Sequence, residues 1–270
     1  MTGEETLRSA PRPQEARVVE RLWPAPGCCE IVLELDEPAE GQPGQFYMLS
    51  TGDALGTYLP RAFSFYRVFS PRRPSFLFRI VGPGTAQLAA LRPGGRLRVL
   101  GPLGRGFPVP DGPGRAVLVA GGVGVPPLWS LARALHGSGW ETLALLGART
   151  ASGLLGAAEL AALGARVEVA TDDGSKGVQG PVTGLLHGRR ADAVFACGPE
   201  PMLKAVQAHA AAEGPRATYL ALEAGMACGY GVCLGCAVRR TEPDPALGPY
   251  GAYARVCREG PVFRWDEVRL

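Results

Sequence analysis

Four cysteines near the end of the chain have the residue type and spacing of a metal centre. Cys228, Cys233 and Cys236 form a C-x4-C-x2-C pattern in the stretch MACGYGVCLGC, and Cys257 follows after 20 further residues. Three close thiols with a distant fourth are typical of plant-type [2Fe–2S] clusters. A structural zinc ion is the alternative, although four-cysteine zinc sites more often use two C-x2-C pairs. The spacing therefore favours a [2Fe–2S] cluster on these four residues and leaves zinc open.

A glycine-rich loop in the middle of the chain is suited to phosphate binding. The sequence AGGVGVPP, residues 120–127, lies between a short apolar run and a helical pattern. In such a strand–loop–helix unit, backbone N–H groups and the helix N-terminus attract a pyrophosphate. Gly121, Gly122 and Gly124 are the candidate residues, and a glycine turn without a ligand is the alternative.

Two later segments follow predicted strands of the same region. Cys197 and Gly198 come after one strand, and the segment 171–175 (TDDGS) comes after another. Ligands of open parallel sheets bind at the carboxyl ends of the strands, so both segments are candidates to face the nucleotide. A buried strand-end cysteine and an exposed Asp-Gly turn are the simpler interpretations.

Residues in the first third of the chain could hold a second cofactor. The stretch PRAFSF, residues 60–65, combines a cation for phosphate, an aromatic ring and a hydroxyl. Strand alternation would place Arg61 and Phe63 on one face and Ser64 on the other, unless a turn or bulge intervenes. A strand carrying Leu77, Phe78 and Arg79 leads into a second phosphate-type loop, residues 81–85. Taken separately, these segments are ordinary turns and strands.

The elements that must position these residues fall into three regions. Short segments with turn signals predict an antiparallel β-barrel over residues 14–108. Alternating strands and helices predict a parallel-sheet α/β domain over 114–222. The glycine- and cysteine-rich segment 223–270 is too small for a core of its own and predicts a metal-stabilised unit. The expected barrel strands are 16–23, 30–35, 45–49, 62–69, 76–81 and 96–100.

Composition excludes several classes of protein. The 270 residues carry a net charge of only +3, which does not call for a nucleic acid or an anionic membrane. The first 21 residues lack the apolar centre of a signal peptide, and the apolar run 116–132 is shorter than a membrane span and holds two prolines. Seven cysteines without a secretion signal argue against a disulfide scaffold. We expect a soluble, cytoplasmic protein.

Together these motifs resemble the ferredoxin reductase superfamily, and within it the electron-transfer subunits of class 1B, NAD-dependent dihydroorotate dehydrogenase. The resemblance extends from about residue 16 to 268. Its specific parts are ATDDGSKGVQGPVTGLL (170–186), ACGPEPML (196–203), MACGYGVCLGC (226–236) and VCREGPVF (256–263). Position 62 is Ala where Pro is expected, position 63 is Phe where Tyr is frequent, and the segment 241–253 reads as an insert.

The resemblance implies a role for each candidate residue. It implies that FAD is bound by Arg61, Ala62, Phe63, Ser64, Leu77, Phe78, Arg79, Gly84 and Thr85. It implies that NAD lies on Gly121, Gly122 and Gly124 with Cys197 and Gly198 near the nicotinamide, and that Cys228, Cys233, Cys236 and Cys257 hold the [2Fe–2S] cluster. No side chain is needed as a catalytic acid or base for hydride transfer at FAD.

The resemblance also implies a partner. Dihydroorotate would be oxidised at the FMN of a catalytic subunit in a heterotetramer with two copies of each chain, as a step of pyrimidine biosynthesis. Electrons would pass through the cluster and FAD of this chain to NAD+. Two alternatives stay open from the sequence: a reductase subunit feeding an oxygenase, hydrogenase or transhydrogenase complex, and a zinc-tailed binding module without enzymatic activity.

Overall fold

The computed structural model describes residues 12–38, 41–52, 59–213 and 217–270. The first part of the chain forms a seven-stranded antiparallel sheet in the order β4-β3-β7-β1-β2-β6-β5. Phe63 on β4 contacts Phe78 on β6, with ring centroids 4.9 Å apart, so the sheet curls until its two ends meet as a barrel. The strands are β1 (Pro13–Ala25), β2 (Cys28–Leu35), β3 (Phe46–Ser50), β4 (Arg61–Ser64), β5 (Val68–Ser70), β6 (Arg73–Arg79) and β7 (Arg96–Leu103).

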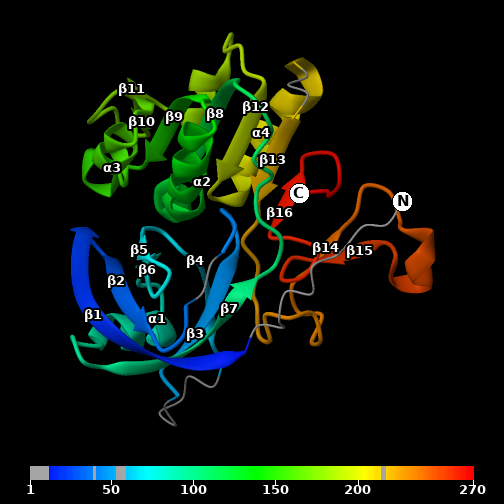
Figure 1. The fold of residues 1–270 in the computed structure, drawn as a ribbon. Coiled ribbons are helices and arrows are strands. Elements are labelled where there is room, and N and C mark those ends of the chain that lie inside the picture. The colour runs from blue at the N-terminus through cyan, green and yellow to red at the C-terminus, as the bar shows by residue number, and fades with distance from the viewer. Residues whose placement is uncertain (1–11, 39–40, 53–58, 214–216) are drawn as a thin grey trace.

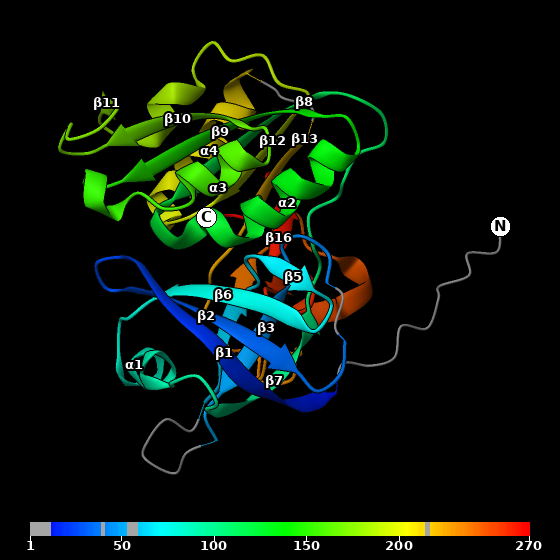
Figure 2. The ribbon, with the colours of Figure 1, turned by 60° about the vertical axis from the view of Figure 1, so that its left-hand side comes forward.

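The second part forms the α/β unit that the alternating pattern predicts. Its sheet has the order β11-β10-β9-β8-β12-β13-β16, in which all pairs are parallel except β13 with β16. Helices α2 and α3 cover one face, and α4 with the short helix η3 covers the other (Figures 1 and 2). The elements are β8 (Arg115–Gly121), η1 (Gly122–Gly124), α2 (Val125–Gly137), β9 (Glu141–Ala148), η2 (Ala151–Gly153), α3 (Ala157–Ala162), β10 (Arg166–Thr171), β11 (Val178–Gln179), η3 (Val182–Leu186), β12 (Ala193–Cys197), α4 (Glu200–Glu213) and β13 (Ala217–Ala221).

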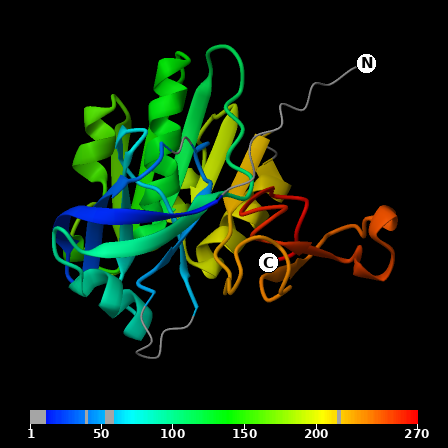
Figure 3. The same ribbon diagram turned by 60° about the horizontal axis from the view of Figure 1, so that its bottom comes forward.

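The C-terminal segment is tied to both larger parts. It contributes β16 (Val262–Arg264) to the edge of the parallel sheet, while β14 (Ala237–Arg239) and β15 (Tyr253–Arg255) pair with each other. Between β14 and β15 the chain runs out to the short helix η4 (Pro245–Tyr250), which projects from the molecule (Figure 3). The insert noted in the sequence therefore forms the tip of an arm beside the cysteine loop.

Aromatic contacts join the barrel to the α/β unit. Tyr66 of the barrel meets Trp129 of α2 edge to face at 5.8 Å, and Arg133 of α2 donates to the carbonyl oxygen of Val68 at 3.1 Å. Tyr66 belongs to the same buried cluster as Leu128 of α2. Because these contacts fix α2 against the barrel, the edge of the sheet from which α2 starts also faces the barrel.

Two local predictions were wrong. The range 62–69 was expected as one strand, but it holds two strands, β4 and β5, because the chain turns between Ser64 and Val68. The range 81–85 was expected as a loop, but helix α1 (Pro83–Ala90) begins inside it. Proline at its first position fits a helix start, and Thr85 Oγ1 accepts from the N–H of Gly82 at 3.2 Å.

No helix in the described part of the chain is both long and apolar enough to span a membrane.

Replacing Phe195 with alanine should destabilise the protein strongly. Phe195 on β12 is fully buried, stacks on Tyr219 at 5.7 Å and meets Phe107 edge to face at 5.5 Å. Loss of the ring should lower the free energy of unfolding by about 3–5 kcal/mol, measured by urea denaturation. Phe69→Ala is the matched control: its ring is 55% exposed, and the expected loss is below about 1 kcal/mol. Equal losses in the two variants would contradict this packing.

Candidate functional site

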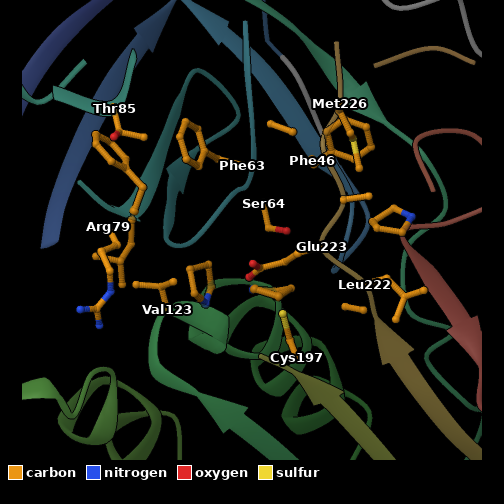
Figure 4. Close-up of a pocket in the computed structure, with 18 of the residues that line it drawn as sticks. Phe46, Phe63, Ser64, Arg79, Thr85, Val123, Cys197, Leu222, Glu223 and Met226 are labelled. Atoms are coloured by element: carbon orange, nitrogen blue, oxygen red, sulfur yellow. The ribbon is translucent and has the colours of Figure 1, made fainter. Parts of the chain in front are cut away.

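A cavity of about 280 Å³ lies where the barrel faces the carboxyl edge of the parallel sheet (Figure 4). The order of the sheet explains this position. From β8 the chain continues to β9 on one side, whereas β12 lies on the other, so the sheet has its switch point between β8 and β12. Such a switch point is where nucleotides bind in open α/β sheets.

Eight of the residues predicted as binding residues line this cavity. They come from three barrel elements and from the end of β12: Ala62, Phe63, Ser64, Leu77, Phe78, Arg79, Thr85 and Cys197. The remaining candidates lie beside it. Arg61 and Gly84 contact each other, and the remaining four glycines lie where the loops after β8 and β12 meet: Gly121, Gly122, Gly124 and Gly198. The structure thus brings the two predicted nucleotide-binding motifs to one place.

The barrel wall of the cavity presents flat rings and one hydroxyl. Phe63 and Phe78 pack against each other with an interplanar angle of 30°, and Ser64 lies next to them. Strand alternation predicted opposite faces for Phe63 and Ser64, but both line the cavity because β4 ends at Ser64. A flat ring system fits against such a wall, with Ser64 able to hydrogen-bond a ring nitrogen.

The start of α1 is built for a phosphate. A methyl group added at Gly84 would lie only 2.5 Å from the guanidinium of Arg61, so the arginine lies directly over the helix N-terminus. The N-terminal N–H groups of a helix and a guanidinium both attract anions. The Arg61 side chain is held in this position because its Nη1 donates a hydrogen bond to the carbonyl oxygen of Leu59 at 2.6 Å.

The glycine loop packs against the end of β12 at backbone distance. A side chain at Gly124 would collide with the carbonyl oxygen of Cys197, and one at Gly198 would lie 2.9 Å from the N atom of Gly121. Gly121 is likewise closed in by Pro199 and Met202. Only Gly122, in the left-handed region at φ +54°, faces open space. The glycines therefore allow the two loops to meet.

Two ionisable groups line the cavity at the same edge of the parallel sheet, Cys197 at the end of β12 and Glu223 after β13. Burial raises the pKa of the Cys197 thiol far above its ordinary value, and the negative charge of Glu223 raises it further. Burial also raises the pKa of Glu223. Glu223 lines the cavity and is exposed, and Figure 4 shows its carboxylate pointing toward Ser64. Cys197 is therefore a neutral thiol and not a nucleophile.

Sequence reasoning missed a second group of lining residues. They belong to η1 and the start of α2, to the end of β13 and the segment after it, and to three isolated positions: Phe46, Val81, Val123, Pro126, Pro127, Ala221, Leu222, Glu223, Ala224, Met226 and Pro261. The position of Glu223 follows from the sheet topology, because it lies just after β13, at the same sheet edge as Cys197. Phe46 and Pro261 come from distant elements, and no local pattern identifies them.

The four cysteines of the C-terminal segment lie as two pairs. Cys236 and Cys257 are buried, and the backbone N–H of Cys257 donates to the sulfur of Cys236 at 3.4 Å. Cys228 and Cys233 are more exposed and interact through their thiols. Within the described ranges, no group of three or more His, Cys, Asp and Glu side chains is arranged to hold a metal ion. Two pairs suit a cluster of two irons with two thiolates on each.

The loop around Cys228 favours thiolate. Burial opposes ionisation of Cys228, but backbone N–H groups of Cys233, Tyr230 and Val232 stabilise the charged sulfur and lower its pKa to about 6. Burial raises the pKa of Cys257 to about 12, and its hydrogen bond with Cys236 adds to this effect. Amide groups aimed at sulfur fit an anionic iron–sulfur centre, so the residues present suit the group that the spacing predicted.

The cavity and the cysteine loop are adjacent along the chain. Met226 lines the cavity, and Cys228 follows two residues later. Gly229 packs so tightly on the barrel that a side chain there would collide with Met48 and touch Leu103. The Cα atom of Cys228 is therefore at most about 7 Å from that of Met226, which lines the cavity.

Known proteins with similar sequences point to one family. The family described as "Iron-sulfur cluster binding domain of dihydroorotate dehydrogenase B" matches residues 223–269. The dihydroorotate dehydrogenase B (NAD(+)) electron transfer subunit of Geobacillus thermodenitrificans is 39% identical over 258 residues, which cover 94% of this chain and 95% of that protein. The corresponding subunit of Bacillus caldolyticus is 41% identical and covers 85% of this chain and 87% of its own length.

Solved structures share the fold. The NADH-dependent reduced ferredoxin-NADP oxidoreductase superposes with a TM-score of 0.79 at 26% identity, covering 94% of this chain and 89% of that one. The ferredoxin reductase in carbazole 1,9a-dioxygenase has a TM-score of 0.68 at 23% identity and covers 76% of this chain and 67% of its own. The predicted fold class, a barrel followed by a nucleotide-binding sheet and an iron–sulfur domain, is confirmed.

Replacing Gly124 with alanine should disturb the site and destabilise the protein. The new methyl group would meet the backbone oxygen of Cys197, which cannot move without shifting β12. We expect a loss of roughly 1–3 kcal/mol in the free energy of unfolding, measured by urea denaturation. Gly137→Ala, at the other end of α2, meets no atom within 4 Å and should stabilise by up to about 1 kcal/mol. The same sign of change in both variants would refute the close approach.

Proposed function

The chain belongs to the family of electron transfer subunits of NAD(+)-dependent dihydroorotate dehydrogenase B, and we propose that it carries electrons between a catalytic subunit and NAD+. The family expected from the motifs is thereby confirmed. The observation that carries the proposal is that three features meet at one cavity. These features are an aromatic wall suited to a flavin, the glycine loop suited to a nucleotide, and the start of the cysteine loop.

The residues of the cavity support binding of two nucleotide cofactors. We assign the ring system of FAD to the wall of Phe63, Ser64 and Phe78, with its pyrophosphate at Arg61 and Gly84. We assign NAD to the glycine loop, with the nicotinamide toward Cys197. When bound, FAD exchanges hydride with nicotinamide and single electrons with an iron–sulfur centre, so it links two-electron and one-electron carriers.

The protein contributes orientation and exclusion of water to this chemistry. Apolar side chains such as Val123, Leu222 and Met226 surround the space between the two nucleotide positions, which keeps bulk water from the reacting atoms. Cys197 stays protonated because of burial, and Glu223 places a carboxyl group at the same edge. Hydride transfer between two stacked rings needs contact and alignment, which rigid walls provide.

The cysteine loop supports the exchange of electrons with a partner protein. We propose that Cys228, Cys233, Cys236 and Cys257 hold a [2Fe–2S] cluster, as the two pairs and the amide groups near Cys228 suggest. Cys233 is exposed, as are Tyr230 and Val232 on the same loop. A redox partner therefore has access to this side. We propose as partner the FMN-containing catalytic subunit, two copies of each chain forming the complete enzyme in the cytoplasm.

Replacing Cys236 with serine should remove the cluster and leave the flavin. Cys236 is buried next to Cys257, far along the chain from the flavin wall, so FAD content should stay near that of the wild type. Iron and acid-labile sulfide should fall to background, measured on anaerobically purified protein. Cys28→Ser, in the barrel, is the control and should keep both iron and sulfide. Full iron content in Cys236→Ser would contradict the ligand assignment.

The proposed partner can be tested by activity and co-purification. The purified chain should reduce an artificial dye with NADH but leave dihydroorotate unchanged. Co-expression with the catalytic subunit should yield a stable complex that reduces NAD+ with dihydroorotate, because we propose that this substrate is oxidised at the FMN of the catalytic subunit. Turnover of dihydroorotate by the isolated chain, or isolation with an oxygenase or transhydrogenase component instead, would overturn the proposal.

A further inference from the structure

One arginine beside the cysteines makes contacts on two sides at once. The guanidinium of Arg255, the last residue of β15, donates to both carboxylate oxygens of Glu259, and its Nη1 donates to the carbonyl oxygen of Gly231 at 3.0 Å. The backbone N–H of Arg255 also donates to Glu259, at 2.7 Å. Gly231 belongs to the cysteine loop, residues 228–236, so this side chain connects that loop to the segment that carries Cys257.

The main chain already holds Cys236 and Cys257 together. The N–H of Cys257 donates to the sulfur of Cys236, and the N–H of Val256 donates to the carbonyl oxygen of Cys236 at 3.0 Å. The carbonyl oxygen of Arg255 accepts from the N–H groups of residues 258–260, which closes the turn around Cys257. The geometry of this cysteine pair is therefore set by backbone contacts.

The segment 228–233, which carries the other pair, is held differently. Among the residues that the structure describes, none of its backbone groups is hydrogen-bonded to another backbone group. Gly231, at a left-handed φ of +90°, is instead bound through its carbonyl oxygen to the guanidinium of Arg255. The N–H of Gly231 stabilises the charged sulfur of Cys257. Arg255 thus orients the residue whose amide reaches the buried cysteine pair.

The ion pair of Arg255 and Glu259 is suited to keep a fixed position. Its side chains are only 31% and 17% exposed, and two N–H groups meet two carboxylate oxygens, a geometry more specific than a single contact. The hydrogen bond with Glu259 raises the pKa of Arg255 against the opposing effect of burial. Negative charge on Cys257 and Cys236 raises this pKa further, so the guanidinium lies within electrostatic reach of both thiols.

We propose that Arg255 is a positioning residue of the cluster site. Held by Glu259, it orders the segment 228–233 so that the exposed and the buried cysteine pairs can bind one cluster, and it is not itself a ligand. The inference rests on the proposed function, because it takes the [2Fe–2S] assignment as its premise. Without the guanidinium, Cys228 and Cys233 would remain but lose their fixed orientation toward the buried pair, so iron should be released more readily.

The experiment compares Arg255→Gln with Arg258→Gln in the anaerobically purified full chain. Arg258 is the matched control, because it is exposed, carries the same charge and also lies against Gly231. The measurement is the rate at which a ferrous chelator removes iron from the dithionite-reduced protein. Arg255→Gln should release iron roughly 10- to 100-fold faster than the wild type, the range for lost hydrogen bonds between charged groups. Arg258→Gln should release it at the wild-type rate.

Two further measurements separate positioning from a general structural role. FAD content and the urea midpoint of Arg255→Gln should equal those of the wild type, whereas the paramagnetic-resonance spectrum of its reduced cluster should change in shape. Arg255→Lys keeps the charge and one donor group, so it should recover part of the wild-type rate. Glu259→Gln should also release iron faster, and the double variant with Arg255→Gln should be no faster than Arg255→Gln alone, because the two side chains act as a unit.

The outcomes distinguish the inference from its premise. Iron release from Arg255→Gln at the wild-type rate, or equal acceleration in Arg258→Gln, would overturn the inference alone. Loss of FAD or of overall stability in Arg255→Gln would also overturn it, since the arginine would then support the fold in general. Zinc in place of iron in the wild-type protein would overturn the proposed function and the inference with it.

Discussion

The approach of the glycine loop to the end of β12 at backbone distance is the constraint on which the site depends. Gly124 lies against the carbonyl oxygen of Cys197, and Gly198 lies against Gly121. Because neither contact leaves room for a side chain, the start of α2 and the end of β12 form one rigid edge. This edge places a helix N-terminus and a neutral thiol side by side, where a nucleotide can contact both.

The barrel forms the other wall of the cavity beside this edge. Helix α2 is the element that both starts at the glycine loop and packs on the barrel through Trp129 and Tyr66. Any tilt of α2 would therefore change the width of the cavity between Phe63 and Cys197. The C-terminal segment adds a third constraint, since β16 pairs with β13 and Gly229 packs on Met48 of the barrel. All three parts of the chain thus meet around one cavity, and two of the buried clusters combine barrel residues with residues of the α/β unit.

Sequence patterns predicted the architecture because it is encoded locally. Apolar runs separated by glycine and proline define the strands, and the carboxyl-edge rule predicted the position of Cys197, which lines the cavity. The strand break after Ser64 and the helix start at Pro83 were missed, because a four-residue strand and an eight-residue helix carry weak periodic signals. Phe46 and Pro261 line the cavity only because distant elements converge, and such contacts depend on topology that no local pattern contains.

The two pairs of cysteines differ in burial, which indicates where the proposed electron path reaches the surface. Cys236 and Cys257 are buried and hydrogen-bonded to each other, whereas Cys228 and Cys233 are closer to solvent. A cluster held by both pairs would have one side inside the protein and one side toward the surface, where Tyr230 and Val232 are exposed. In the proposed arrangement, nicotinamide would instead meet the flavin wall inside the cavity. Hydride transfer requires the exclusion of water, whereas electron exchange with a partner requires an accessible surface. In the proposed arrangement, the chain meets the first requirement in the cavity and the second at the exposed side of the cysteine loop.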